Sequence, residues 1–216
     1  MQAAIFDMDG LLVDTEPFWQ DAELKVFPTV GVPLQRKMCL ATIGLRIDEV
    51  VAHWYAQYPW TGKSQEQVAQ EILEEVAAAV RERGTLLSGA QEAIALARNQ
   101  GLRTALASSS AKYLIRNVLQ TFDLEDEFEM FRSAEDDAYG KPHPAVFLRT
   151  AADLGIHPTQ CVVLEDSYHG LLAAKAARMR AIAVPEAHSA QDPRFVIADV
   201  RLTNLTELTG AHLTGL

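Results

Sequence analysis

The sequence has few groups that could crosslink it, because only two of its 216 residues are cysteines. Cys39 and Cys161 lie far apart and form no CxxC pair, which argues against a disulfide framework and indicates reduced thiols. Long apolar runs are also missing, and the amino terminus has no basic segment followed by a long apolar stretch. We therefore expect a cytoplasmic protein with no membrane partner.

Positive charge is scarce as well, since 19 Lys and Arg residues stand against 29 Asp and Glu residues and give a formal net charge of −10. Affinity for nucleic acid depends on cationic contacts to phosphate groups, so we expect no nucleic-acid partner. Low-complexity tracts and repeats are absent too, and 49% of the residues are hydrophobic. This composition is typical of an ordinary globular protein.

Short apolar runs alternate with helical patterns along most of the chain, which predicts an α/β fold built on a Rossmann-like, doubly wound parallel sheet. The predicted strands are Ala3–Phe6, Leu102–Ala107, Cys161–Leu164 and Ala181–Val184, and the predicted helices between them are Ala90–Asn99, Lys112–Phe122, Pro144–Leu154 and Gly170–Ala177.

Residues 15–85 break this alternation, because they carry helical patterns with little strand signal. The clearest helix is Ser64–Arg83, which begins with a capping box of Ser64 and Gln67 and is followed by Gly84 as a stop. We expect a catalytic core formed by residues 1–14 and 86–216, with an all-helical cap domain, residues 15–85, inserted after the first strand.

Four polar loops follow predicted strands or lie between the alternating elements. In open α/β sheets ligands bind at the carboxyl ends of the strands, so these loops form the candidate site. Each has a structural explanation when taken alone, because aspartates and serines form turns and caps and a lysine before proline is usually an exposed charge. Together they supply the groups for metal-assisted phosphoryl transfer. The loops are Asp7-Met8-Asp9-Gly10, Ser108-Ser109-Ser110, Gly140-Lys141-Pro142 and Glu165-Asp166-Ser167.

The order and strand context of these motifs resemble those of the haloacid dehalogenase (HAD) superfamily of phosphohydrolases, in the β-phosphoglucomutase-like subgroup with a helical cap. The resemblance spans nearly the whole chain. Within that subgroup the sequence looks most like the bacterial hexitol and 2-deoxyglucose-6-phosphate phosphatases. The narrower resemblance depends on Ile43-Gly44-Leu45-Arg46, His53-Trp54-Tyr55, Pro59-Trp60 and the segment Lys175–Met179.

The resemblance implies a phosphatase of small sugar or sugar-alcohol phosphates that forms an aspartyl-phosphate. Asp7 would be the nucleophile and Asp9 the general acid and base, and Asp9 must therefore be protonated at one stage. Ser108 would bind a phosphoryl oxygen, Ser109 would add its backbone amide, and Lys141 would neutralise the phosphate and aspartate charges.

An anionic nucleophile that attacks a phosphate dianion needs cations nearby, and magnesium (Mg2+) suits oxygen ligands. The predicted metal ligands are Asp7, the backbone carbonyl of Asp9, and Asp166, with Mn2+ or Co2+ as possible substitutes for Mg2+. Glu165 either binds the metal through water or orients Asp166, and both alternatives stay open. The partner would be a small phosphorylated metabolite, and we expect a monomer.

Arg46 of the predicted cap, with Gly44 beside it, is the candidate for a second phosphate clamp, because a guanidinium can bind two oxygens at once. The alternative is an ordinary surface arginine. Trp19, Trp54 and Trp60 could stack on a sugar, but packing explains them equally well.

Three other functions fit parts of this pattern. A sugar phosphomutase would use the same aspartates, although that enzyme has a histidine where this chain has Trp19. A dehalogenase would have an apolar residue in place of Asp9. A receiver-like signalling module would be shorter, and its acidic pair would precede the phosphorylated aspartate, whereas Glu165 and Asp166 come last here.

Overall fold

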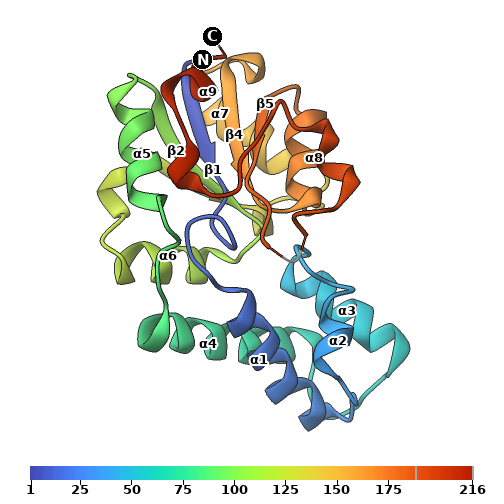
Figure 1. The fold of residues 1–216 in the computed structure, drawn as a ribbon. Helices are drawn as coiled ribbons and strands as arrows, with labels where there is room; N and C mark the ends of the chain where they lie inside the picture. Colours follow the sequence, from blue (N-terminus) through green and yellow to red (C-terminus); the bar gives the residue numbers. More distant parts are fainter. Residues whose placement is uncertain (188, 216) are drawn as a thin grey trace.

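A six-stranded parallel sheet forms the centre of the computed structural model, which describes residues 1–187 and 189–215 (Figure 1). The strand order is β3-β2-β1-β4-β5-β6. Because the order reverses at β1, a crevice opens at the carboxyl ends of β1 and β4, where such sheets bind ligands. The strands are β1 Ala3–Phe6, β2 Arg103–Ser108, β3 Met130–Ser133, β4 Cys161–Glu165, β5 Arg180–Ala183 and β6 Val200–Arg201.

Helices cover both faces of the sheet, because each strand turns alternate apolar side chains to opposite sides. Phe6 packs on the face that carries α5, α6 and α9, whereas Ile5 packs on the face that carries α7 and α8. Both layers are visible in Figure 1. These helices are α5 Ala90–Asn99, α6 Lys112–Thr121, α7 Ala145–Asp153, α8 Tyr168–Ala176 and α9 Gly210–Thr214.

The predicted fold class is confirmed, and all four predicted strands are present within two residues of their expected limits. Two strands were missing from the prediction. β3 is short, and Arg132 gives it a charged residue among partly buried ones, while β6 has only two residues. Neither offers the apolar run that indicates a buried strand. Ser108 is the last residue of β2 rather than the first of the loop.

Four helices, α1 to α4, lie between β1 and α5 in the sequence and away from the sheet in space (Figure 1). The chain enters and leaves this segment along one path, since Val13 pairs with Leu86 and the Leu87 amide donates to the Leu12 carbonyl at 2.9 Å. We call residues 15–85 the helical insertion. Its helices are α1 Glu16–Val26, α2 Arg36–Cys39, α3 Ile47–Gln57 and α4 Gln65–Arg83.

Helix α4 holds the insertion together and ties it to the sheet layer, because it packs against α1 and α3 on one side and α6 on the other. Its start was predicted correctly: the Ser64 hydroxyl accepts from the Gln67 amide and the Gln67 side chain accepts from the Ser64 amide. Val68, Ile72 and Val76 form its buried stripe.

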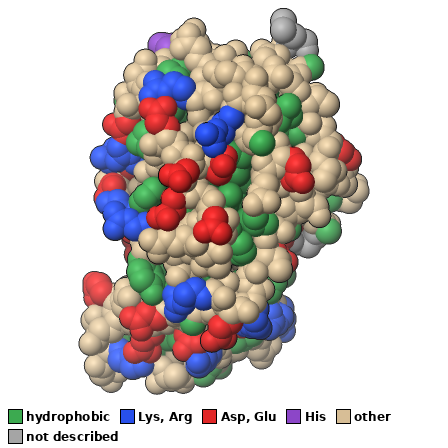
Figure 2. All heavy atoms as spheres, turned by 90° about the vertical axis from the view of Figure 1, so that its left-hand side faces the viewer, with side chains coloured by type: hydrophobic (Ala, Val, Ile, Leu, Met, Phe, Trp, Pro, Cys, Tyr) green, Lys and Arg blue, Asp and Glu red, His purple; other side chains and the backbone are tan. Residues whose placement is uncertain are grey.

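The charged side chains are mixed in sign on the face shown in Figure 2, where acidic and basic groups alternate rather than gather into one patch. Several form surface pairs, for example Lys25 with Glu75 at 2.5 Å. Within the described residues, no helix combines the length and the apolar character that crossing a bilayer would require.

Candidate active site

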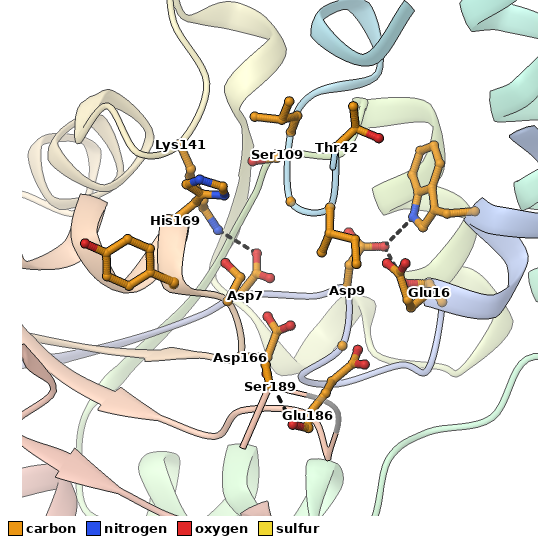
Figure 3. A pocket seen from close by; sticks show the side chains of 18 of the residues that line it. Asp7, Asp9, Glu16, Thr42, Ser109, Lys141, Asp166, His169, Glu186 and Ser189 are labelled. Carbon is orange, nitrogen blue, oxygen red and sulfur yellow. Dashed lines mark hydrogen bonds and ion pairs between the residues drawn. The ribbon is translucent and has the colours of Figure 1, made fainter. Parts of the chain in front are cut away.

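A cavity of about 510 Å³ lies between the carboxyl ends of the strands and the helical insertion (Figure 3). Its sheet wall comes from the loops after β1, β2 and β4, together with Lys141 and the segment after β5. Its insertion wall comes from α1 and from residues near the loop that precedes α3. The insertion wall consists of Thr15, Glu16, Trp19, Glu23, Cys39, Leu40, Thr42, Ile43, Gly44, Leu45, Ile47 and Val50.

Asp7 lies at the base of the cavity, directly after β1, and is held by one buried lysine. The ammonium group of Lys141 donates to Asp7 Oδ1 at 2.7 Å, to Glu165 Oε1 at 2.5 Å and to the Ala107 carbonyl at 3.2 Å. All three N–H groups of the lysine therefore have partners. The ends of β1, β2 and β4 thus meet at one cation.

The charges around Lys141 do not balance, because Asp7, Glu165 and Asp166 together could carry two more negative charges than this lysine can neutralise. Burial raises the pKa of Asp7 to about 8, and repulsion from Glu165 adds to the effect while Lys141 opposes it. Burial likewise raises the pKa of Asp166 well above its usual value, again with repulsion from Glu165. Burial by itself lowers the pKa of Lys141, but the attraction of Asp7 and Glu165 more than reverses this.

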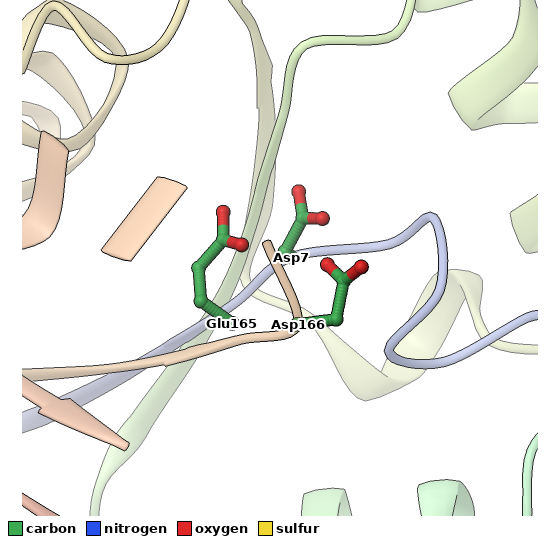
Figure 4. A group of neighbouring side chains, drawn as sticks. All are labelled: Asp7, Glu165 and Asp166. Carbon is green, nitrogen blue, oxygen red and sulfur yellow. The ribbon is translucent and has the colours of Figure 1, made fainter. Parts of the chain in front are cut away.

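The same three carboxylates fit a divalent cation. Oxygen atoms of Asp7, Glu165 and Asp166 all lie within 4.8 Å of one another, and Figure 4 shows the side chains converging from the ends of β1 and β4. Asp166 Oδ1 is buried and has no hydrogen-bond partner within the described structure. A hard cation such as Mg2+ would satisfy this oxygen and offset the excess negative charge.

Glu165 differs from the other two carboxylates because both of its oxygens already have partners. Oε1 accepts from Lys141, and Oε2 accepts from the Ser167 amide at 3.1 Å and the Ser167 hydroxyl at 3.0 Å. The residue is fully buried. Glu165 therefore positions Lys141 and the segment before α8, while its two predicted roles, binding the metal through water or orienting Asp166, stay predictions.

Two glycines let the carboxylates approach the backbone this closely. A Cβ atom at Gly170 would lie 1.7 Å from Glu165 Oε1, and one at Gly10 would lie 2.5 Å from Asp166 Oδ2. Gly10 also has a φ of 71°, which favours glycine. Any side chain at either position would displace a carboxylate of the site.

Asp9 points toward a different set of groups and accepts four hydrogen bonds. Ser108 and Ser110 donate to Oδ2 at 3.2 and 2.7 Å, while the Thr15 hydroxyl and the Trp19 indole donate to Oδ1 at 2.7 and 3.3 Å. Two donors come from the β2–α6 loop region and two from the start of the helical insertion. The Asp9 side chain is thus held by both walls of the cavity.

The serines at the end of β2 and in the loop after it make different contacts. Ser108 is buried, donates to Asp9 and accepts from the Ser110 amide at 3.0 Å. Ser109 lines the cavity, and its buried hydroxyl has no partner in the described structure. Of the two predicted phosphate ligands, Ser109 thus has the free hydroxyl.

Arg46 lies outside the cavity lining, in contrast to the expectation that it binds a second phosphate. Its guanidinium donates to the carbonyls of Ala134 at 2.9 Å and Asp137 at 2.7 Å and pairs with Asp48 at 2.7 Å. Carbonyls of the sheet layer, rather than the cavity, thus occupy its donors. Gly44 does line the cavity, with a φ of 78°.

The insertion wall consequently presents no Lys or Arg to the cavity among the described residues. On the sheet wall the positively charged groups are Lys141, which is fully engaged, and Arg194, which pairs with Asp192 at 2.5 Å and stacks over Tyr168.

Thr15, Glu16, Glu23 and Glu186 line the site but were not predicted from the sequence, whereas Ser110 was predicted within a site loop without a role of its own and Trp19 only as a residue that could stack on a sugar. The spacing of Glu16, Trp19 and Glu23 could have indicated one shared helix face. Nothing in the spacing shows which way that face turns. Glu186 acts on Asp166 electrostatically from a loop that has no recognisable pattern.

Comparison with known proteins gives consistent results. The family model described as haloacid dehalogenase-like hydrolase matches residues 1–178. Hexitol phosphatase B of Escherichia coli K12 is 51% identical over 214 residues, which cover 99% of this chain and 96% of that protein.

Two solved structures share the whole architecture. CbbY of Rhodobacter sphaeroides, solved with xylulose 1,5-bisphosphate, has a TM-score of 0.90 at 25% identity and covers 99% of both chains. β-Phosphoglucomutase of Clostridium difficile has a TM-score of 0.86 at 23% identity, over 98% of this chain and 95% of that one, which supports the fold alone.

Proposed function

The chain belongs to the haloacid dehalogenase-like hydrolase family and is a phosphatase of that family, and we propose that it hydrolyses phosphate monoesters of small sugars or sugar alcohols. The observation that carries the proposal is Asp7, buried at the base of the cavity between Lys141 and the carboxylate of Asp166. The similarity to hexitol phosphatase B supports hexitol phosphates as the first substrates to test.

Asp7 is the proposed nucleophile. One of its carboxylate oxygens attacks the phosphorus atom in line, and the bond from phosphorus to the ester oxygen breaks, which leaves an aspartyl-phosphate and an alkoxide. Lys141 stays paired with Asp7 Oδ1 and stabilises negative charge next to the phosphoryl group. The free hydroxyl of Ser109 and the hydroxyl of Ser108 are the proposed ligands of the phosphoryl oxygens.

Asp9 is the proposed proton carrier. It gives a proton to the leaving alkoxide and later removes one from the water that attacks the aspartyl-phosphate, which releases phosphate and restores Asp7. Thr15, Trp19 and Ser110 would orient it for both steps.

The ligands that would hold Mg2+ are Asp7, Asp166 and the backbone carbonyl of Asp9, with Glu165 fixing Lys141 and with Mn2+ or Co2+ as substitutes. When bound, the metal would supply positive charge to the phosphoryl group during transfer. Asp166 Oδ1, buried without a hydrogen-bond partner in the described structure, is the observation that supports this assignment.

Hydrolysis is favoured over the phosphomutase reaction by the insertion wall. A mutase working through a bisphosphate must bind a second phosphate at the far end of the sugar, and cations are the groups that do so. The guanidinium of Arg46 donates to carbonyls of the sheet layer, and the described insertion wall has no Lys or Arg. A substrate whose far end is neutral and carries hydroxyl groups fits this wall better than a bisphosphate does.

We also propose that residues 15–85 act as a cap domain on a core of residues 1–14 and 86–216. The isolated bridge between Val13 and Leu86, where the chain enters and leaves this segment, supports a common hinge. The expected monomer and cytoplasmic location remain predictions.

Phosphate release should be measured with hexitol, hexose and deoxyhexose phosphates, with and without Mg2+. We expect release that depends on Mg2+ and is fastest for one of these esters. A parallel reaction with glucose 1-phosphate and a bisphosphate primer tests the alternative, because isomer formation that outpaces phosphate release would contradict the proposal.

A further inference from the structure

Helix α1 turns one stripe of polar and aromatic side chains toward the cavity. Glu16, Trp19 and Glu23 follow one another at helical spacing, and all three line the cavity. Trp19 already donates to Asp9, and Glu16 accepts from the Gln20 side chain at 2.8 Å. Glu23, the last of the three along the helix, takes no part in the proposed chemistry.

Glu23 is an unusual residue for such a position because it is a carboxyl group that is only 6% exposed. Its Oε2 atom is buried and has no hydrogen-bond partner in the described part of the structure. The Cys39 thiol is a neighbouring titratable group, and it donates its hydrogen bond to the Gln35 carbonyl at 3.9 Å. Burial raises the pKa of Glu23 to about 7, and the opposing effect of the Cys39 thiol only partly offsets this rise.

A buried oxygen without a partner is unfavourable, so a ligand that donates a hydrogen bond to it would be bound selectively. The lining of the insertion wall indicates which kind of ligand group could donate a hydrogen bond to Glu23. The described insertion wall has no Lys or Arg, repulsion from Glu16 adds to the negative potential at Glu23, and the Thr42 hydroxyl already donates to the Cys39 carbonyl at 3.1 Å. A second phosphate would be repelled, whereas a neutral hydroxyl group can donate.

We propose that Glu23 is the specificity residue that recognises a hydroxyl group of the substrate, at the end of the molecule opposite the phosphate. The inference rests on the proposed function, since the phosphate is assigned to Asp7 and Lys141 on the sheet wall and Glu23 lies on the insertion wall. It extends that function by naming the residue that distinguishes a polyol from a plain alkyl chain.

The test compares two ligands of equal chain length, hexitol 6-phosphate and n-hexyl phosphate, which lacks the hydroxyl groups. Affinities are measured by calorimetry in the Asp7→Asn background with Mg2+ present, so that no turnover intervenes. We expect Glu23→Met to reduce the preference for the hexitol ester about tenfold or more, because a site built to bind hydroxyl groups loses its discrimination with the acceptor. Glu23→Gln keeps an acceptor oxygen and should lose less.

Asp21→Asn is the matched control, because Asp21 lies on the same helix but pairs with Arg36 at the surface and should keep the wild-type preference. Circular dichroism checks that each variant is folded. An equal loss of affinity for both ligands, or an unchanged preference in Glu23→Met, would overturn the inference.

The same ligands separate this inference from the proposed function. If the enzyme with Asp7 intact releases no phosphate from any polyhydroxylated ester, the proposed function is wrong. The ratio of the affinities for hexitol 6-phosphate and n-hexyl phosphate in the Asp7→Asn background still decides whether Glu23 recognises a hydroxyl group.

Discussion

The two walls of the cavity differ in what their buried polar atoms without a hydrogen-bond partner could bind. On the sheet wall Lys141 has three acceptors, Glu165 has a partner for each oxygen, and Asp9 accepts four hydrogen bonds. On the insertion wall Glu23 keeps a buried oxygen without a described partner. The sheet wall also keeps Asp166 Oδ1 and the Ser109 hydroxyl without a described partner, but these lie among charged groups and suit a metal ion and a phosphoryl oxygen, whereas Glu23 lies on a wall without Lys or Arg and suits a neutral hydroxyl group.

This difference indicates a division of labour. Catalysis depends on groups that need no rearrangement when charge develops in the transition state, and the sheet wall provides them. Selectivity depends on groups that gain a partner only from the right ligand, which is the situation at Glu23. Substitutions on the two walls should therefore have different kinetic signatures.

The largest effect is expected on the sheet wall. Asp7→Asn removes the nucleophile, so kcat for phosphate esters should fall by at least about ten-thousandfold, while the fold is retained. Phosphate release in the presence of Mg2+ measures this. Asp126→Asn, an exposed change in the turn before β3, is the control and should remain near wild type. A near-normal rate for Asp7→Asn would refute the nucleophile assignment.

The sequence predicted the sheet wall far better than the insertion wall, and the reason is geometrical. Strands of a parallel sheet end at one edge, so residues after different strands must meet there, as Asp7 and Asp166 do. Lys141 follows no strand directly and was identified from its motif. No comparable rule applies to a helical insertion.

The direction of a side chain in the insertion depends on how its helices pack. Arg46, which directly precedes α3, was expected at the phosphate, yet its guanidinium donates to the Ala134 and Asp137 carbonyls. Trp19 and Glu23 are four residues apart and so share a face of α1, but the direction of that face depends on how α1 packs against its neighbours, among them α4. Substrate choice is therefore the part that a single sequence does not specify.

The buried Glu23 of the insertion wall should also make the stability of the protein depend on pH. The unfolded Glu23 carboxyl has the ordinary pKa of 4.5, and the folded one has a pKa of about 7. Between these values the folded protein retains a proton that the unfolded chain has lost, so stability falls as the pH rises through this window. The effect should amount to at most about 3 kcal/mol, and urea unfolding at several pH values measures it.

Glu23→Gln should lack this component, because an amide does not titrate. The free energy of unfolding of the variant, relative to wild type, should rise from pH 4.5 to pH 7 and then stay level. A constant difference across that range would show that Glu23 is not a buried titrating group.

Metal binding at the sheet wall should stabilise the folded protein, and the effect should depend on the carboxylates of that wall. At a hundredfold excess over its dissociation constant, Mg2+ should add about 2.7 kcal/mol to the free energy of unfolding, which for a chain of this size raises Tm by roughly 5–10 °C. Asp166→Asn should largely remove this response, and Asp126→Asn should retain it. Thermal scans with a metal titration measure both, and an undiminished response in Asp166→Asn would contradict the proposed ligand set.

The smallest effect on activity is expected at the contact between the two walls. Trp19 belongs to the insertion wall but donates to Asp9 at 3.3 Å, so Trp19→Phe removes one of four donors while keeping an aromatic ring. We expect kcat to fall about fivefold, since a hydrogen bond of this length to a carboxylate contributes about 1 kcal/mol.

Trp60→Phe is the matched control for that change, because its indole also donates one hydrogen bond, but to the Lys63 carbonyl within the insertion. If Trp19 positions Asp9 for proton transfer, only Trp19→Phe should enlarge the solvent deuterium isotope effect on kcat, since proton transfer then limits the rate more strongly. Equal isotope effects in the two variants would mean that Trp19 merely packs, and that the insertion wall contributes to binding alone.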